Sequence, residues 1–102
     1  MIMIRYLNEC PGVYTVGRDS ECDIVINDFF VNKKHMQLIV TDDGELYCVD
    51  LDSRNGTYVN GVRITGKTHL NKPDVIKIGK TTLRMDKFIG NNKPLKKIWK
   101  IF

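Results

Sequence analysis

Cationic and amide side chains gather at three points of the sequence, each beside a short apolar run. The first point holds Arg18, the second holds Asn32 and Lys33, and the third holds Arg54 and Asn55. A guanidinium group donates two parallel hydrogen bonds to an oxyanion, and ammonium and amide groups supply further donors. These side chains have the chemistry to bind a phosphate group, provided that the fold brings the three points together.

Glycines and a histidine accompany these donors. Gly17 and Gly56 stand directly beside the first and third points, where the lack of a side chain lets backbone segments approach closely. His35 could act as a base or a metal ligand, but no second His, Cys or carboxylate stands at metal-ligand spacing from it. The sequence also shows no nucleophile–base pair, no two carboxylates with a reason to lie near each other, and no P-loop. We therefore expect no enzyme, no metal and no cofactor.

The elements that must position these residues are short strands. Runs rich in Val, Ile, Tyr and Thr recur about every eight to twelve residues, which is typical of an all-β sandwich or barrel. Turn signals such as Asp43-Gly44 and Asn60-Gly61 separate them, and no segment before residue 90 has a sustained helical period. The predicted strands are residues 3–7, 13–16, 23–26, 35–40, 46–50, 57–59, 62–64, 75–78 and 81–85.

Length and composition indicate one globular domain. The chain has 102 residues, 42% of them hydrophobic and 27% charged. No apolar run is long enough for a membrane span, and the N-terminus lacks the pattern of a secretory signal. Three cysteines without a C-x-x-C pair indicate reduced thiols, with Cys48 as a core residue. We expect a cytoplasmic protein, at the cytoplasmic face of a membrane if it is part of a longer chain.

The basic excess lies at the C-terminus. The formal net charge is +4, but residues 87–102 hold five lysines and no acid, so the body is nearly neutral. We therefore predict a β-sandwich domain over residues 1–86 and a lysine-rich tail over residues 87–102, with no nucleic-acid partner. An amphipathic spacing of apolar residues favours a short helix in the tail. Three roles stay open for this tail: packing on the sandwich, contact with an anionic membrane, and the start of a further segment.

In their order along the chain, these motifs resemble the forkhead-associated (FHA) domain family. The resemblance begins with Gly17-Arg18, passes through residues 32–35 and the stretch at residues 49–61, and ends with Ile78-Gly79. It runs from about residue 3 to residue 86. It implies an antiparallel β-sandwich of the SMAD/FHA type, whose loops at one end bind phosphothreonine in a partner protein of Ser/Thr kinase signalling. Such domains are not enzymes, and we expect a monomer.

The resemblance also assigns roles to individual residues. The implied phosphopeptide contacts are Arg18, Asn32, Lys33, Arg54, Asn55 and Asn60, and the implied structural supports of the site are Gly17, His35 and Gly56. Asn32 departs from the family, which most often has serine at this position. The alternative is therefore an FHA-like scaffold that binds its partner without phosphate.

Three apolar residues in the second loop have two interpretations. In the family, a preference for the third residue after the phosphothreonine adds to specificity. Phe29, Phe30 and Val31 could read that residue, which would then be apolar. Phe29 and Phe30 could instead close the end of the sandwich.

Overall fold

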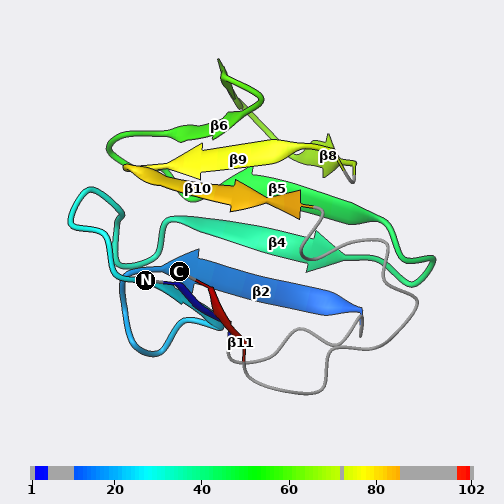
Figure 1. The fold of residues 1–102 in the computed structure, drawn as a ribbon. Helices are drawn as coiled ribbons and strands as arrows, with labels where there is room; N and C mark the ends of the chain where they lie inside the picture. Colours follow the sequence, from blue (N-terminus) through cyan, green and yellow to red (C-terminus); the bar gives the residue numbers. More distant parts are fainter. Residues whose placement is uncertain (1, 5–10, 72, 86–98, 102) are drawn as a thin grey trace.

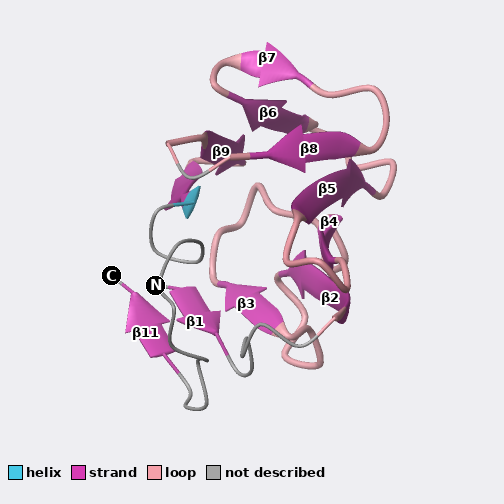
Figure 2. Cartoon of the chain, turned by 90° about the vertical axis from the view of Figure 1, so that its right-hand side faces the viewer, coloured by secondary structure: helices cyan, strands magenta, loops and turns pink. Residues whose placement is uncertain are grey.

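Two packed β-sheets make up the protein, as the sequence predicts (Figures 1 and 2). The computed structural model describes residues 2–4, 11–71, 73–85 and 99–101, and these contain no α-helix. The strands are β1 (Ile2–Ile4), β2 (Gly12–Gly17), β3 (Ile24–Ile26), β4 (Met36–Val40), β5 (Leu46–Asp50), β6 (Thr57–Val59), β7 (Val62–Arg63), β8 (Thr68–Leu70), β9 (Val75–Ile78), β10 (Thr81–Arg84) and β11 (Trp99–Ile101).

The larger sheet has seven strands in the order β11-β1-β3-β2-β4-β5-β8, and the smaller has the order β10-β9-β6-β7. Neighbouring strands are antiparallel with one exception, because β2 and β3 pair in parallel through Val16↔Ile24 and Gly17↔Val25. The Asp23 carboxylate supports this short pairing by accepting a hydrogen bond from the backbone N–H of Thr15 at 2.9 Å. The sandwich is therefore almost, but not wholly, antiparallel.

Alternating burial along the strands builds the core between the sheets. The Asn60-Gly61 turn that joins β6 to β7 has positive φ at both residues, as the sequence signal predicts. The buried cluster consists of Tyr14, Val16, Ile24, Ile26, Val31, Met36, Leu38, Val40, Leu46, Cys48, Leu70, Ile76, Ile78, Leu83 and Met85. Burial raises the pKa of the Cys48 thiol to about 11, which agrees with its interpretation as a core residue.

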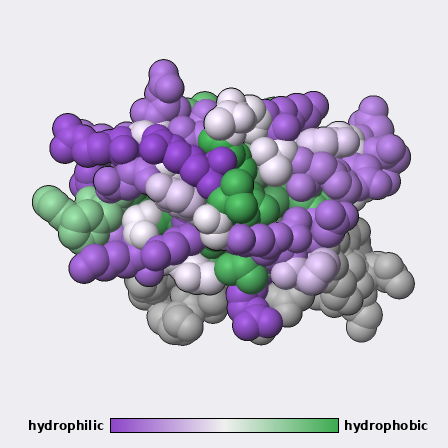
Figure 3. Space-filling model, turned by 90° about the horizontal axis from the view of Figure 1, so that it is seen from above, coloured by the Kyte–Doolittle hydropathy of each residue, from purple (hydrophilic) through white to green (hydrophobic). Residues whose placement is uncertain are grey.

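A narrow apolar band crosses one side of the molecule (Figure 3). Seen from above, where β6 and β8 lie in Figure 1, hydrophobic side chains form a strip between hydrophilic ones (Figure 3). Val62 is exposed, while Val59 and Ile64 pack against the core. None of the described segments forms a helix long and apolar enough to cross a membrane.

Several strand boundaries differ from the prediction. Strand β8 was not predicted, because its three residues carry no recognisable alternation, yet it pairs with β5. Strand β7 ends at Arg63 rather than at residue 64. Strand β1 covers Ile2–Ile4, and residues 5–7 of the predicted strand lie outside the described part of the chain.

The last described residues of the predicted tail form a strand and not a helix. Strand β11 pairs antiparallel with β1, which would otherwise be the edge of the larger sheet. Eight residues at helical spacing are too few to stabilise an isolated helix against such pairing. Residues 87–98, on which most of the helix prediction falls, lie outside the described residues, and so does the predicted domain boundary at residue 86. The pairing agrees with a tail that packs on the sandwich.

Candidate functional site

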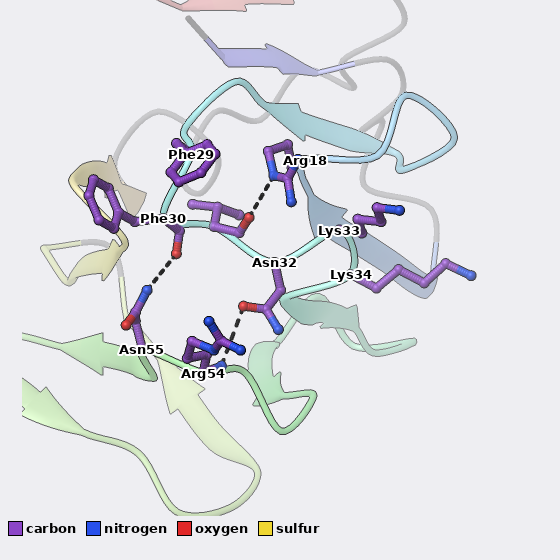
Figure 4. A pocket seen from close by; sticks show the side chains of 9 residues that line it. Arg18, Phe29, Phe30, Asn32, Lys33, Lys34, Arg54 and Asn55 are labelled. Atoms are coloured by element: carbon purple, nitrogen blue, oxygen red, sulfur yellow. Dashed lines mark hydrogen bonds between the residues drawn. The ribbon is translucent and has the colours of Figure 1, made fainter.

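Loops from both sheets meet at one end of the sandwich, at the left of Figure 1. They are residues 18–23 after β2, residues 27–35 between β3 and β4, and residues 51–56 between β5 and β6. A pocket of about 700 Å³ opens between them (Figure 4). Its lining consists of Arg18, Phe29, Phe30, Val31, Asn32, Lys33, Lys34, Arg54 and Asn55. Five of the six predicted contacts are thus brought together, and Asn60 is not among them.

The pocket is cationic. Arg18, Lys33, Lys34 and Arg54 line it, and no carboxylate does. The contact between a carboxylate and a basic side chain that joins Glu45 to His69 lies outside the pocket. Four cations without a neutralising carboxylate produce a positive potential that attracts an anionic ligand.

Backbone hydrogen bonds between the first and second loops hold Arg18 at the pocket. The backbone N–H of Arg18 donates to the carbonyl of Asn32 at 2.9 Å, and that of Asp19 donates to the carbonyl of Lys33 at 3.1 Å. A Cβ atom on Gly17 would lie 2.1 Å from the carbonyl oxygen of Lys33, so only glycine fits there. The Nε of Arg18 donates to the Val31 carbonyl at 3.0 Å, which fixes the side chain and leaves the terminal guanidinium nitrogens for a ligand.

The amide of Asn32 has a defined orientation. Its Oδ1 accepts a hydrogen bond from the backbone N–H of Arg54 at 3.3 Å. Because a backbone N–H can only donate, the oxygen must face Arg54, and the NH₂ group remains as a donor for the ligand. Figure 4 shows this side chain between Arg18 and Arg54. The residue that departs from the usual serine therefore still presents a donor.

His35 joins the second loop to the third from inside the molecule. Its ring is fully buried, its Nδ1 accepts from the backbone N–H of Asn32 at 3.1 Å, and its Nε2 donates to the Gly56 carbonyl at 2.9 Å. These partners require the neutral ring with its proton on Nε2. The geometry matches the bracing role that the family resemblance implies. No group of three metal-ligating side chains occurs among the described residues.

Asp50 and Ser53 fix the third loop, and the sequence analysis missed both. Asp50 Oδ1 accepts from Ser53 Oγ at 2.5 Å and Thr57 Oγ1 at 2.6 Å, and Ser53 Oγ accepts from the backbone N–H of Gly56 at 3.0 Å. The Asp-x-x-Ser spacing was the available signal, because such side chains stabilise turns. Burial acts to raise the pKa of Asp50, but these hydrogen bonds outweigh it and hold that pKa below its ordinary value.

This arrangement predicts a stability loss in acid. A carboxyl group whose pKa is lowered on folding stabilises the protein above its unfolded pKa of about 3.9, and that contribution disappears as the pH falls through the folded value. We expect Asp50→Asn to lower the free energy of unfolding by about 1–3 kcal/mol at pH 7. In urea titrations the difference between wild type and variant should shrink below about pH 4. A difference that stayed constant in acid would contradict this origin.

Asn55 and Asn60 hold different parts of the structure. Asn55 Nδ2 donates to the Phe30 carbonyl at 2.9 Å, which leaves its Oδ1 as an acceptor. Asn60 Nδ2 donates to Asp74 Oδ1 at 3.0 Å, and its Oδ1 accepts from the backbone N–H of Val75 at 3.0 Å. The Asn60 side chain thus ties β6 to β9, and its predicted contact with peptide stays a prediction.

Asp28, a second carboxylate that the sequence analysis missed, clamps the aromatic part of the second loop. Its Oδ1 accepts from the backbone N–H of Phe30 at 2.8 Å, and its Oδ2 accepts from the backbone N–H of Lys80 and the Thr81 hydroxyl, both at 2.7 Å. Burial opposes ionisation, but these bonds lower the pKa of Asp28 from its usual value. The loop between β3 and β4 is therefore tied to the opposite sheet.

The loop that Asp28 holds in place exposes two aromatic rings to solvent. Phe29 is 85% exposed and Phe30 is 45% exposed, whereas Val31 is 1% exposed. Val31 closes the sandwich end, so the interpretation that both phenylalanines do so is wrong. The two rings pack edge to face at 5.9 Å, and the Lys80 ammonium lies 4.7 Å from the centre of the Phe30 ring. They form an apolar wall on one side of the cationic pocket (Figure 4).

Fold and pocket together define a β-sandwich module with a cationic pocket at its loop end. The sequence profile of the FHA domain matches residues 14–79, which is more than half of the chain. The chain therefore belongs to the FHA domain family, in agreement with the resemblance of its motifs.

Two of the similar proteins are named as an inhibitor and a regulator. The chain is 38% identical over 79 residues to an oxoglutarate dehydrogenase inhibitor of Corynebacterium efficiens, with 78% of this chain and 54% of that protein covered. It is 34% identical to the glycogen accumulation regulator GarA of Mycolicibacterium smegmatis, with 78% and 48% covered. The chain thus spans about half the length of these relatives.

Solved structures share the fold. An FHA domain from Chlamydia trachomatis has a TM-score of 0.69 and 26% identity, with 79% of this chain and 91% of that chain covered. The N-terminal FHA domain of Saccharomyces cerevisiae Rad53p, solved in complex with a phosphothreonine peptide, has a TM-score of 0.61 and 34% identity. There the match covers 67% of this chain and 56% of that chain.

Proposed function

We propose that this chain binds phosphothreonine in a partner protein of Ser/Thr kinase signalling, and that the loop-end pocket is the binding site. The observation that carries the proposal is the set of four unneutralised cations around Asn32, in the family whose solved members include phosphothreonine-peptide complexes. A phosphothreonine brings about −1.5 to −2 charges and three strong acceptor oxygens at neutral pH. The charge and the donors of the pocket match that group.

The contacts divide between phosphate and peptide. The guanidinium of Arg18, the ammonium of Lys33 and the NH₂ of Asn32 donate to the phosphate, each charge-assisted bond contributing about 1.5–3 kcal/mol. Arg54 flanks the phosphate, and Asn55 accepts from a peptide N–H through Oδ1. The chain acts by binding rather than by catalysis, in a cytoplasmic setting where kinases supply the phosphoryl group.

The aromatic wall gives the site a second preference. Phe29 is exposed and precedes Phe30, whose backbone N–H donates to Asp28. Its ring is therefore available to an apolar side chain of the peptide near the phosphothreonine. We expect wild type to favour leucine over alanine at one flanking position by about fivefold to tenfold, since burying a few methylene groups stabilises the complex. Phe29→Ala should bring that ratio close to one, and a peptide array measures it. A ratio unchanged in the variant would contradict this contact.

A titration against a degenerate phosphothreonine peptide library tests the proposed function. Saturable binding that matched phosphoserine and unphosphorylated libraries do not reproduce supports it. Equal binding of all three libraries would instead support the phosphate-independent scaffold, and no binding by any of them would refute both.

Substitutions of Asn32 distinguish binding that depends on phosphate from the phosphate-independent scaffold. If its NH₂ group donates to the phosphate, Asn32→Ala should weaken phosphopeptide binding about tenfold, which is the value of one hydrogen bond to a charged group. Asn32→Ser should retain more affinity than Asn32→Ala, because the hydroxyl is again a donor. Equal affinities of all three proteins would show that residue 32 does not contact the phosphate.

A further inference from the structure

The loop-end pocket has two unlike sides. In Figure 4, the rings of Phe29 and Phe30 lie on one side of Asn32. The side chains of Lys33 and Lys34 lie on the other side, and both are exposed. A peptide that crosses the pocket therefore meets an apolar surface on one side of its phosphothreonine and a basic surface on the other.

The pocket also carries more positive charge than one phosphothreonine balances. The cationic side chains in its lining are Arg18, Lys33, Lys34 and Arg54. A phosphothreonine brings about −1.5 to −2 charges, so roughly two positive charges keep no counterpart in the complex. Arg18 and Lys33 are the proposed cationic partners of the phosphate, which leaves Lys34 and Arg54 as the source of the surplus.

The acidic residues of the first loop do not line the pocket. This loop, between β2 and β3, holds Asp19, Glu21 and Asp23. Asp19 Oδ1 accepts a hydrogen bond from the backbone N–H of Glu21 at 3.0 Å, and Asp23 Oδ2 accepts one from the backbone N–H of Thr15 at 2.9 Å. These two carboxylates stabilise the backbone of β2 and of their own loop, so the surplus charge of the pocket remains for a group of the ligand.

The backbone that carries Lys34 is fixed on both sides. The carbonyl of Lys33 accepts a hydrogen bond from the Cys22 thiol at 3.2 Å. The backbone N–H of His35 donates to the Val16 carbonyl at 2.8 Å, and the His35 ring is buried. A side chain that starts from a fixed backbone loses less conformational freedom when it binds, so it can favour one position of a peptide over the others.

We propose that the bound phosphopeptide carries a second anionic side chain, and that the Lys34 ammonium binds it. The inference rests on the proposed function and names the class of peptide: an apolar residue on one side of the phosphothreonine and an anionic residue on the opposite side. Successive residues of an extended peptide lie about 3.3 Å apart, which places the anion within about three positions of the phosphothreonine. An Asp or Glu carboxylate and a second phosphate share this chemistry, and separate peptides distinguish them.

A phosphothreonine peptide array tests the two-sided preference. Glu is compared with Gln, and Leu with Ala, at each of three positions on either side of the phosphothreonine. Exposed ion pairs are weak, so wild type should favour Glu over Gln by about threefold to fivefold at one position, with a ratio close to one at about 0.5 M salt. That position should lie on the opposite side of the phosphothreonine from the position where Leu is favoured. Both preferences on the same side, or the absence of either one, would overturn the inference.

A second phosphate is tested at the position where Glu is favoured. Phosphoserine carries about twice the charge of Glu, so it should exceed Gln by about tenfold if the anion is a phosphate. A preference no greater than that for Glu assigns the position to a carboxylate. Either result supports the inference, whereas phosphoserine that binds no better than Gln would overturn it.

Matched variants test where the preference for Glu arises. Lys34→Gln should bring the Glu-to-Gln ratio close to one. Lys80→Gln is the control, because it removes the same charge from the aromatic side, where this ammonium lies 4.7 Å from the centre of the Phe30 ring. The inference is overturned if Lys34→Gln keeps the ratio, if Lys80→Gln lowers it equally, or if Arg54→Gln abolishes it while Lys34→Gln does not.

The same array separates this inference from the proposed function. Saturable binding that requires phosphothreonine, with a Glu-to-Gln ratio near one at every position in wild type, would overturn the inference alone. Binding of no phosphothreonine peptide at all would overturn the proposed function and the inference together.

Discussion

Replacing Arg18 with alanine is expected to weaken phosphothreonine-peptide binding about 100-fold, without unfolding the protein. Truncating one partner of a close charge pair typically has an effect of this size, because the other charge loses its counterpart. Arg18 is exposed, and the described contact of its side chain is one hydrogen bond to the Val31 carbonyl. Calorimetric titration of wild type and variant with one phosphopeptide measures the loss.

Arg18→Lys is the control for charge alone. It keeps the positive charge but lacks the planar pair of donors, so we expect its affinity to lie between those of wild type and alanine variant. Wild-type affinity in the alanine variant would show that the phosphate does not lie against Arg18. Thermal denaturation of both variants should stay close to wild type.

The second large effect concerns stability. His35→Ala should lower the free energy of unfolding by about 3–5 kcal/mol, because it leaves a cavity and removes the partners of two buried backbone groups. These groups are the N–H of Asn32 and the carbonyl of Gly56, so the second and third loops lose their shared support. Urea denaturation measures the loss directly.

His69 supplies the matched control for His35. It is the other histidine of the chain and lies on an exposed sheet face, where its Nε2 contacts Glu45 Oε2 at 2.6 Å. Exposed ion pairs stabilise proteins by about 0–1 kcal/mol, so His69→Ala should cause only a small loss. Equal losses in the two variants would contradict the bracing role of His35.

The strands and turns that were predicted correctly are those whose own residues carry a local signal. The strands around Val16, Leu38 and Cys48 carry enough alternation to be recognised, and the Asn60-Gly61 turn has the positive φ values that its residue types favour. The three donor-bearing loops were also found, because Arg, Lys and Asn supply the donors that an oxyanion such as phosphate binds. Their convergence on one pocket came from the family resemblance and is now visible in the structure.

The parts that were missed depend on contacts across long sequence distances. The carboxylate of Asp28 bonds to residues 52 and 53 positions away, which no local pattern reveals. Strand β8 exists because β5 offers it an edge, and β11 exists because β1 does. The orientation of Phe29 likewise follows from the clamp on its loop and not from its own hydrophobicity.

The phosphorus-31 NMR resonance of a bound phosphothreonine peptide tests the central claim most directly, because it reports on the phosphate itself. We predict that the resonance shifts and saturates on titration with wild type, and that Arg18→Ala at the same concentrations produces almost no shift. Amide resonances of the pocket loops are recorded in parallel. Saturable changes in those amides while the phosphorus resonance stays at its free position would contradict the account, since the peptide would then bind without its phosphate in the pocket.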